Sequence, residues 1–359
     1  MTASCDTRLV YYPDSRPGIS RVRRGRGFSY LAPDGTAIAC PVERARLASL
    51  AVPPAYRKVW ICPVPEGHLQ ATGLDDRDRK QYRYHPLWSE FRARLKFDQL
   101  PAFARTLPRI RRRLARDLEA EPGTQRFALA ALVSLIDRVG IRVGNRDYLE
   151  ENGSYGATTL KRRHLRLMPD RIVLRYKAKG GARVQQTLKN PRLHRVLQEI
   201  DDLPGADLFT WLDAQGNPHP LRSETVNDYL GEISGEAAHT AKTFRTWLGT
   251  LRAFQTAEAA GEGRLTVKAM ATAAAEQLGN TPTIARNSYI HPDVTALAEQ
   301  DAEARREKLA AAARGRVSGL RGGESALCAF LEAEIGQRAD GFAGAEPEPG
   351  ESRLSPDLG

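Results

Sequence analysis

The sequence predicts an α+β protein, in which a small β-rich N-terminal domain precedes a larger, mostly helical domain with a short three-stranded sheet. Two patterns predict this division. Up to about residue 100, short runs of strand-forming residues alternate with turns rich in Gly and Pro. From about residue 89, apolar residues recur at helical spacing. We therefore place the domains at residues 1–90 and 91–320, followed at residues 321–359 by a C-terminal extension that ends in a disordered acidic tail.

Length and composition are ordinary for a soluble globular protein. The chain has 359 residues, which suggests about two domains, and its hydrophobic and charged fractions are 41% and 27%. No apolar run approaches the roughly 18 residues that a membrane helix requires. The first twenty residues lack the apolar core of a secretory signal. We therefore exclude the membrane, secreted and disordered classes and expect a cytoplasmic protein.

The four cysteines do not indicate a metal site. They are far apart in the sequence, and no two of them form a CxxC pair or a Cys/His metal spacing. We interpret all four as reduced thiols of a cytosolic protein: Cys5, Cys40, Cys62 and Cys328. The sequence also contains no P-loop and no GxGxxG fingerprint, so neither of these motifs indicates a bound nucleotide.

Individual elements can be predicted from apolar spacing and turn residues. In the N-terminal domain, residues 58–62 form a strand candidate bounded by prolines. The apolar side chains of residues 124–139 cover most of a helix circumference, so we expect a buried helix there. Pro292 fits a break between the last two helices. The strands expected in the C-terminal domain are residues 164–168, 171–176 and 183–188, and the helices that follow are residues 191–200, 223–235, 240–259, 265–278, 282–290 and 293–314.

The charge of the chain points to a polyanionic partner. Lys and Arg total 54 against 43 Asp and Glu, a net charge of +11, and 44 of the 54 are arginines, whose forked donors fit phosphate oxygens. The last twenty residues carry five acids and one arginine, so the rest of the chain is more basic than the total. Nine basic residues between Arg92 and Arg116 face one acid, Asp98. A solvated helix face usually mixes both signs, so we favour phosphate contact for these nine.

Three segments place a basic side chain in unusual surroundings, although each has a structural explanation when taken alone. Arg142 lies between two glycines directly after the apolar helix, where a helix cap and a solvent-exposed arginine would suffice. Lys179 lies beside two glycines in the turn that joins the last two strands, which ordinary turn chemistry explains. Arg245 is flanked by Phe244 and Trp247, and the alternative there is an exposed arginine whose stem packs on the tryptophan.

A fourth segment runs from Asn280 to Tyr289. In the structural explanation, Asn280 or Thr281 caps a helix that begins at Pro282, and Tyr289 is a partly buried tyrosine near its end. A helix start can also hold a phosphate near Asn280. Each of the four segments is a weak signal by itself, but their order along the chain is specific.

That order, together with the surrounding motifs, resembles the type IB DNA topoisomerases, specifically the compact bacterial and poxvirus-like branch. The resembling motifs span roughly residues 20–295, which is most of the chain. They are YRKVWICP at residues 56–63, GHLQATG at 67–73, RKQYRYHP at 79–86, RVGN at 142–145 with ENGSYG at 151–156, KGG at 179–181, FRTW at 244–247, and the stretch 280–289.

The resemblance implies a mechanism. Tyr289 would attack a phosphodiester of duplex DNA, form a 3′-phosphotyrosyl link and free a 5′-hydroxyl, which reseals the strand after it has swivelled. Arg142 and Arg245 would stabilise the charge of the transition state, and Lys179 would be the general acid. Asn280 stands where viral and eukaryotic enzymes have histidine, so it can donate a hydrogen bond to phosphate but adds no charge. Positive and negative supercoils would both relax without ATP, metal or another cofactor.

The resemblance also implies how DNA is held. In the family the two domains form a clamp around the duplex, and the enzyme acts as a monomer. Arg79, Tyr82 and Tyr84 resemble residues that face the major groove, although a surface turn with aromatic rings packed beneath it would explain them as well. Asn145 and Tyr148 resemble positions that touch DNA near the active site. The partner implied is supercoiled double-stranded DNA, with no membrane partner and a nucleoid-associated place in the cytoplasm.

Two alternative functions stay open from the sequence. A tyrosine site-specific recombinase shares the phosphotyrosine chemistry and a similar residue order, but its helix motif usually reads His-x-x-Arg. Here Lys242 stands three residues before Arg245, so that histidine is absent. The other alternative is a non-catalytic DNA-binding protein on the same scaffold, and the presence of the whole catalytic set argues against it.

Overall fold

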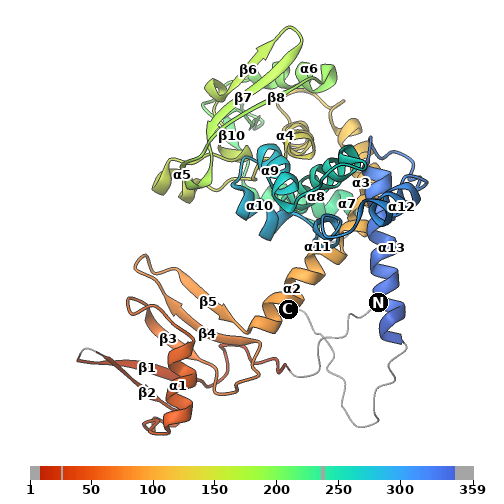
Figure 1. Ribbon diagram of the computed structural model, residues 1–359. Helices are drawn as coiled ribbons and strands as arrows, with labels where there is room; N and C mark the ends of the chain where they lie inside the picture. Colours follow the sequence, from red (N-terminus) through yellow and green to blue (C-terminus); the bar gives the residue numbers. More distant parts are fainter. Residues whose placement is uncertain (1–8, 26, 236–238, 344–359) are drawn as a thin grey trace. The chain divides into compact units, whose positions relative to one another are not determined.

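The computed structural model describes residues 9–25, 27–235 and 239–343, without the side chains of Tyr148 and of residues 339–343 (Figure 1). Helices and antiparallel sheets are both present, so the mixed class that the sequence predicts is confirmed. The chain divides into two compact units, Met1–Phe97 and Asp98–Ala345. The finer domain limits at residues 90 and 320 stay predictions, and the acidic end of the tail lies outside the described residues.

The N-terminal unit is built on a five-stranded antiparallel sheet with the order β2-β1-β3-β4-β5. Leu47 of the helix α1 (Pro41–Ser49) packs among apolar side chains of this sheet, including Val59 and Ile61. The sequence analysis did not predict this helix. The strand expected at residues 58–62 is confirmed, shifted by one residue. The elements are β1 (Ile19–Arg24), β2 (Gly27–Leu31), α1 (Pro41–Ser49), β3 (Arg57–Ile61), β4 (Leu69–Leu74) and β5 (Lys80–Tyr84).

The C-terminal unit is organised around α4 (Gln125–Val139), the buried helix that the sequence predicts. Thr124 begins this helix by accepting a hydrogen bond from the amide of Phe127 at 3.3 Å. Figure 1 shows three further helices, α8 to α10, side by side. The helices besides α4 are α2 (Pro86–Asp98), which leads into this unit, and α3 (Leu100–Asp117), α5 (Arg146–Asn152), α6 (Pro191–Asp201), α7 (Ser223–Ser234), α8 (Ala241–Ala260), α9 (Val267–Leu278), α10 (Pro282–Tyr289), α11 (Pro292–Ala296), α12 (Ala302–Ala312) and α13 (Glu324–Ala343).

A three-stranded antiparallel sheet lies in the same unit, as predicted. Its strands are β6 (Leu165–Met168), β7 (Arg171–Lys177) and β8 (Arg183–Leu188), in the order β6-β7-β8. A 3₁₀ turn, η3 (Lys179–Gly181), joins β7 to β8, and we call the segment from Arg171 to Leu188 the Lys179 hairpin. A second small hairpin, β9 (Thr210–Leu212) with β10 (Pro218–Pro220), was not predicted.

The expectation of one helix over residues 293–314 is wrong. The break at Pro292 is confirmed, but α11 ends at Ala296 and α12 begins only at Ala302. Asp301 separates them because its carboxylate accepts a hydrogen bond from the amide of Ala304 at 2.8 Å, which is a helix N-cap. Neither α5 nor α13 was predicted as a helix.

Several of the nine basic residues assigned to phosphate contact are paired within the protein instead. Arg111 of α3 is largely buried and donates to Asp137 at 2.9 and 3.0 Å and to Glu324 at 2.7 and 2.8 Å. The prediction is therefore wrong for Arg111, and Arg105 with Glu332 and Arg113 with Asp117 are two further ion pairs. Glu324 lies 213 residues from Arg111 in sequence, so a local count of charges could not reveal the pair.

Three general features of the described residues complete the fold. No helix among them is long and apolar enough to cross a membrane. Cys40, Cys62 and Cys328 are free thiols, as predicted, and Cys5 lies outside the described ranges. In the same part of the chain, no group of three or more His, Cys, Asp or Glu side chains is arranged to hold a metal ion.

Candidate active site

The loop after α4 fixes the position of Arg142. Gly140 ends α4 in the left-handed conformation, with φ of +65°. The carbonyl of Arg142 accepts a hydrogen bond from the amide of Ala157 at 2.8 Å. The two backbone segments are so close that a Cβ on Gly156 would lie 2.5 Å from the Cα of Gly144. Arg142 is thus half-buried on a loop with little freedom to move.

Arg245 of α8 is a deeply buried charge near this loop, with 3% of its surface exposed. Its guanidinium donates to the carbonyl oxygen of Gly140 and, at 3.3 Å, to that of Leu278, so it joins the ends of α4 and α9. The Nε of Arg245 is buried without a hydrogen-bond partner among the described residues. Burial and the nearby charge of Arg142 lower the pKa of Arg245.

Tyr289 ends α10 directly beneath that guanidinium. The Cζ of Arg245 lies 4.8 Å from the centre of the Tyr289 ring, and 9% of the tyrosine is exposed. The hydroxyl of Thr250 donates to the backbone carbonyl of Tyr289 at 3.1 Å. A Cβ on Gly249 would lie 2.8 Å from the same carbonyl oxygen, so only glycine permits this contact of α10 with α8.

The cations around Tyr289 favour its phenolate. Burial alone would raise the pKa of Tyr289, but the charge and hydrogen bonding of Arg245, with the charges of Arg142 and Lys242, outweigh that effect. The pKa of Tyr289 therefore lies below the ordinary value for tyrosine, which is about 10. A lowered pKa increases the fraction of the nucleophilic anion at neutral pH.

Asn280 completes the group. Its side-chain oxygen accepts a hydrogen bond from Arg142 at 2.5 Å, while its Nδ2 is buried with no partner among the described residues. The helix cap is its neighbour Thr281, whose hydroxyl accepts from the amide of Ile284 at 3.3 Å, with Pro282 as the first helical residue. The Asn280 side chain is therefore not needed to begin α10.

The structure thus brings four of the five catalytic candidates together: Arg142, Arg245, Asn280 and Tyr289. The fifth, Lys179, lies at the exposed tip of the Lys179 hairpin. Gly180, the next residue, has a φ of +81°, so the tip adopts a backbone conformation that suits glycine.

Two residues near this group were not identified as candidates from the sequence. Tyr176 of β7 is buried beside Arg142 and Arg245, and burial raises the pKa of Tyr176 to about 12, so this second tyrosine stays neutral. Lys242 lies three residues before Arg245 on α8 and helps to lower the pKa of Tyr289. The available signals were the alternation of buried residues along β7 and the helical spacing on α8. Neither signal shows that a residue lies near the catalytic candidates until the fold is known.

The aromatic residues predicted to face DNA lie on β5, in the N-terminal unit. Tyr82 and Tyr84 are 49% and 46% exposed, and their rings stack at 6.0 Å with an interplanar angle of 7°. The alternative, in which these rings pack beneath a surface turn, therefore does not describe Tyr82 and Tyr84. The ammonium of Lys80 lies 5.6 Å from the Tyr82 ring centre, and Arg79 pairs with Asp75 at 2.9 Å.

The other two predicted DNA contacts lie at the start of α5. Asn145 is exposed and caps this helix, because its side-chain oxygen accepts from the amide of Asp147 at 2.7 Å. Its amide nitrogen is the part of the side chain that this cap does not use. Tyr148 lies within α5, and its side chain is outside the described residues.

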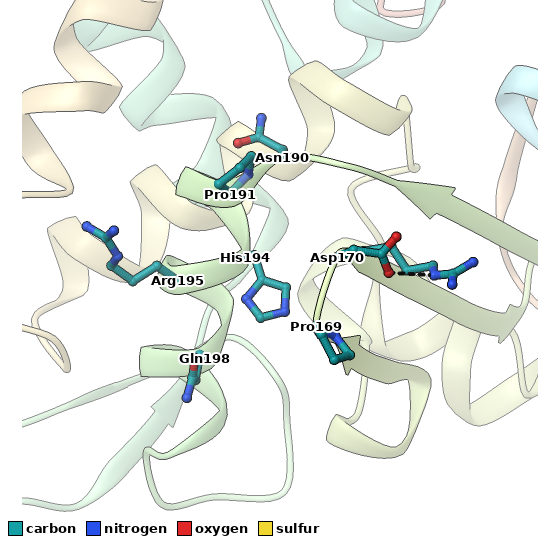
Figure 2. Close-up of a pocket in the computed structure, with 8 residues that line it drawn as sticks. Pro169, Asp170, Asn190, Pro191, His194, Arg195 and Gln198 are labelled. Atoms are coloured by element: carbon teal, nitrogen blue, oxygen red, sulfur yellow. Dashed lines mark hydrogen bonds and ion pairs between the residues drawn. The ribbon is translucent and has the colours of Figure 1, made fainter.

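The candidate site is distinct from an open surface hollow elsewhere in the C-terminal unit. That hollow, of about 250 Å³, lies between the β6–β7 turn and the start of α6, where Figure 2 shows His194 between Pro169 and Arg195. The imidazole of His194 lies 2.8 Å from the carbonyl oxygen of Met168. None of the five catalytic candidates lines this hollow.

The fold and the site together define a class of protein. A buried tyrosine set among arginines, on a helical domain, suits attack on a phosphodiester, and both topoisomerases and recombinases can use such a group. Family models distinguish between them. The model described as "Eukaryotic DNA topoisomerase I, catalytic core" matches residues 88–314, and "Bacterial DNA topoisomerase IB, N-terminal domain" matches residues 27–75. The chain belongs to the type IB DNA topoisomerase family.

Individual relatives agree with this assignment. DNA topoisomerase 1B of Acanthamoeba polyphaga mimivirus is 28% identical over 286 residues, which cover 76% of this chain and 85% of the viral protein. DNA topoisomerase 1B of vaccinia virus (strain Copenhagen) is 22% identical over 238 residues, 66% of this chain and 73% of that protein. A solved post-cleavage complex of the XerH site-specific recombinase on a palindromic difH substrate is 18% identical, with a TM-score of 0.37, over 53% of this chain and 49% of that one. The recombinase alternative is the less supported one, because the family models and the viral relatives are topoisomerases.

Proposed function

We propose that this topoisomerase relaxes supercoiled duplex DNA through Tyr289. The phenolate oxygen attacks a backbone phosphorus, a Tyr289–phosphorus bond forms at the 3′ side, and the bond from phosphorus to the 5′-oxygen breaks. The cut strand then swivels about the intact one, and the freed 5′-hydroxyl attacks back to restore the phosphodiester and release the tyrosine. The observation that carries this proposal is the position of Tyr289 beneath the Arg245 guanidinium, which lowers the pKa of the phenol.

Two unpaired donors support a phosphate at this place. The Nε of Arg245 and the Nδ2 of Asn280 are both buried without hydrogen-bond partners among the described residues. A buried donor left unpaired costs about 1–3 kcal/mol, so an acceptor from the substrate would remove a penalty that the free protein carries. The non-bridging oxygens of a phosphodiester are such acceptors, and Arg142 adds a third donor, which is charged, beside them.

Lys179 is the proposed general acid. The departing 5′-oxygen is a strong base and requires a proton, which an ammonium at the tip of the Lys179 hairpin can donate once DNA lies against it. The proton that leaves Tyr289 passes to solvent. Every step of this scheme conserves the number of phosphodiester bonds, so it requires no nucleotide hydrolysis.

The way in which the protein holds DNA is also part of the proposal. We place the exposed Tyr82 and Tyr84 of the N-terminal unit, with Arg79, against the duplex, and Asn145 and Tyr148 near the cleaved strand. The two units would close around the duplex as a clamp, the enzyme would act as a monomer, and its place would be the nucleoid. The net charge of +11 favours such a polyanionic partner.

Relaxation of a supercoiled plasmid tests the proposal directly. The wild-type protein is incubated with negatively or positively supercoiled plasmid, in EDTA and without ATP, beside Tyr289→Phe. The phenylalanine variant keeps the ring beneath Arg245 but has no nucleophile, so we expect relaxation of both plasmids by the wild type and none by the variant. If the wild type binds the plasmid but leaves the supercoils intact, the proposal fails, and strand exchange between two sites becomes the activity to measure.

A further inference from the structure

Gln186 of β8 connects three parts of the active site. Its side-chain nitrogen donates to the carbonyl oxygen of Val139 at 3.2 Å and to that of Gln277 at 2.8 Å. Both carbonyls belong to the last turns of helices, α4 and α9, where backbone acceptors have no partner within the helix. A side chain of the hairpin thus satisfies two helix ends at once.

These two helix ends lead directly into catalytic loops. Val139 lies three residues before Arg142, and Gln277 lies three residues before Asn280. Arg245 makes the same connection one residue further along each segment, because it donates to the carbonyls of Gly140 and Leu278. Two side chains from different elements therefore join the same two segments, and of these two it is Gln186 that belongs to the Lys179 hairpin.

The hairpin transmits this anchor to its tip. Strands β7 and β8 pair in register from Ile172–Leu188 to Lys177–Arg183, which leaves Lys179 in the turn beyond the last pair. Val184, two residues from Gln186 on the same strand face, packs closely on Gly279, where an added Cβ would lie 2.6 Å from a Val184 methyl group. The position of Lys179 therefore depends on where β8 is held.

The orientation of the Gln186 amide is determined by its neighbours. Both groups within hydrogen-bonding distance of Nε2 are carbonyl oxygens, so the nitrogen must face them. The Oε1 of Gln186 is buried with no hydrogen-bond partner among the described residues. The two hydrogen bonds of the nitrogen are thus what the polar side chain provides at this position.

We infer that Gln186 is a positioning residue that holds the Lys179 hairpin in place relative to Arg142 and Asn280, so that the general acid meets the leaving oxygen. This inference rests on the proposed function, in which Lys179 protonates the 5′-oxygen. Because Arg245 still joins the two catalytic loops when Gln186 is replaced, loss of Gln186 frees mainly the hairpin. The expected defect is therefore in leaving-group protonation and not in attack by Tyr289.

The test compares two leaving groups under single-turnover conditions with saturating enzyme. One duplex carries the natural 5′-oxygen at the cleavage site, and the other carries a 5′-sulfur, which leaves without a proton because thiols have a pKa of about 8.5. Gln186→Leu keeps the side-chain size but makes neither hydrogen bond. A displacement of about 1 Å can cost on the order of 100-fold, so we expect up to that loss with oxygen and a much smaller loss with sulfur.

Matched variants separate positioning from folding. Gln185→Leu makes the same change at the neighbouring residue of β8. Gln185 is exposed and its side-chain oxygen accepts from Arg175 across the strand pair, so this variant should keep the wild-type rates. Adding Gln186→Leu to Lys179→Ala should cause little further loss with the oxygen substrate, because the acid is already absent. If Gln186→Leu does not fold, Gln186→Asn, which is too short to span both carbonyls, replaces it.

Three results would overturn the inference: equal losses with oxygen and sulfur, additive losses with Lys179→Ala, or an unchanged rate in Gln186→Leu. A wild-type protein that cleaves neither duplex would instead refute the proposed function itself. DNA affinity and thermal melting, measured on each variant, show whether a loss of rate reflects binding or stability.

Discussion

Two neighbouring residues at the start of α10 have different tasks. Thr281 caps the helix, whereas Asn280 accepts from Arg142 and keeps a buried donor without a partner among the described residues. We therefore expect Asn280→Ala to slow single-turnover cleavage, on the order of 100-fold for a donor that meets transition-state charge, with little change in melting temperature. Thr281→Ala should lose about 1 kcal/mol of stability, the value of a helix cap, and keep most of the rate.

The comparison of these two alanine variants distinguishes chemistry from capping. Cleavage rates are measured at saturating enzyme, and stabilities by thermal or denaturant unfolding. The assignment of Asn280 to the phosphate would be wrong if its alanine variant cleaved as fast as the wild type and lost only stability. Because asparagine adds no charge, its contact with phosphate depends on how the side chain is oriented. Arg142 holds that side chain by donating to its oxygen at 2.5 Å.

At the scale of elements, α13 is held to the C-terminal unit by a buried network of charges. Glu324, at its start, accepts from Arg111 of α3 and, at 3.3 Å, from the indole nitrogen of Trp247 of α8. Glu332, two turns along α13, pairs with Arg105 at the surface. We expect Glu324→Ala to destabilise the protein by about 3–5 kcal/mol, because it leaves buried Arg111 with less compensation. Glu332→Ala should cost at most about 1 kcal/mol.

The pair of Glu324 and Arg111 predicts that the stability of the protein depends on pH. Burial alone would raise the pKa of Glu324, but the charge and hydrogen bonds of Arg111 outweigh it, so the pKa lies below the ordinary value. A carboxylate whose pKa is lowered on folding adds stability above its unfolded pKa and loses that contribution as pH falls through the folded value. The difference in unfolding free energy between wild type and Glu324→Ala should therefore shrink in acid. A difference independent of pH would show that packing, and not charge, makes the contribution.

The elements that could be predicted are those whose signals are local. The apolar circumference of α4 and the alternating strands of the Lys179 hairpin are visible in sequence, and the structure confirms both. The prediction of a continuous helix over residues 293–314 was wrong because the carboxylate of Asp301 caps the start of a new helix there. The phosphate assignment of Arg111 failed for another reason: its partners, Asp137 and Glu324, arrive from other helices.

At the scale of the whole molecule, the catalytic candidates were found through their order along the chain, and their arrangement required the fold. Three segments far apart in sequence, which carry Arg142, Arg245 and the stretch from Asn280 to Tyr289, meet because Arg245 joins the ends of α4 and α9. The residues that sequence analysis missed, Tyr176, Lys242 and Gln186, lie around the place where these segments meet. A glutamine on a strand has no distinguishing signal until the carbonyls that it bonds are known.

At the same scale, all five catalytic candidates lie in the C-terminal unit, whereas the exposed aromatic pair that we propose as a DNA contact lies in the N-terminal one. Replacing Tyr82 and Tyr84 together by alanine should therefore weaken DNA binding, by about 1–2 kcal/mol, or on the order of tenfold in Kd, if the rings are central contacts. The cleavage rate at saturating enzyme should stay at the wild-type value, because nothing around Tyr289 changes. Val42→Ala, which removes another exposed apolar side chain from the same unit, should alter neither quantity. Titration of duplex DNA and single-turnover cleavage measure the two effects separately. A slower rate at saturation would mean that the N-terminal unit also takes part in assembling the active site.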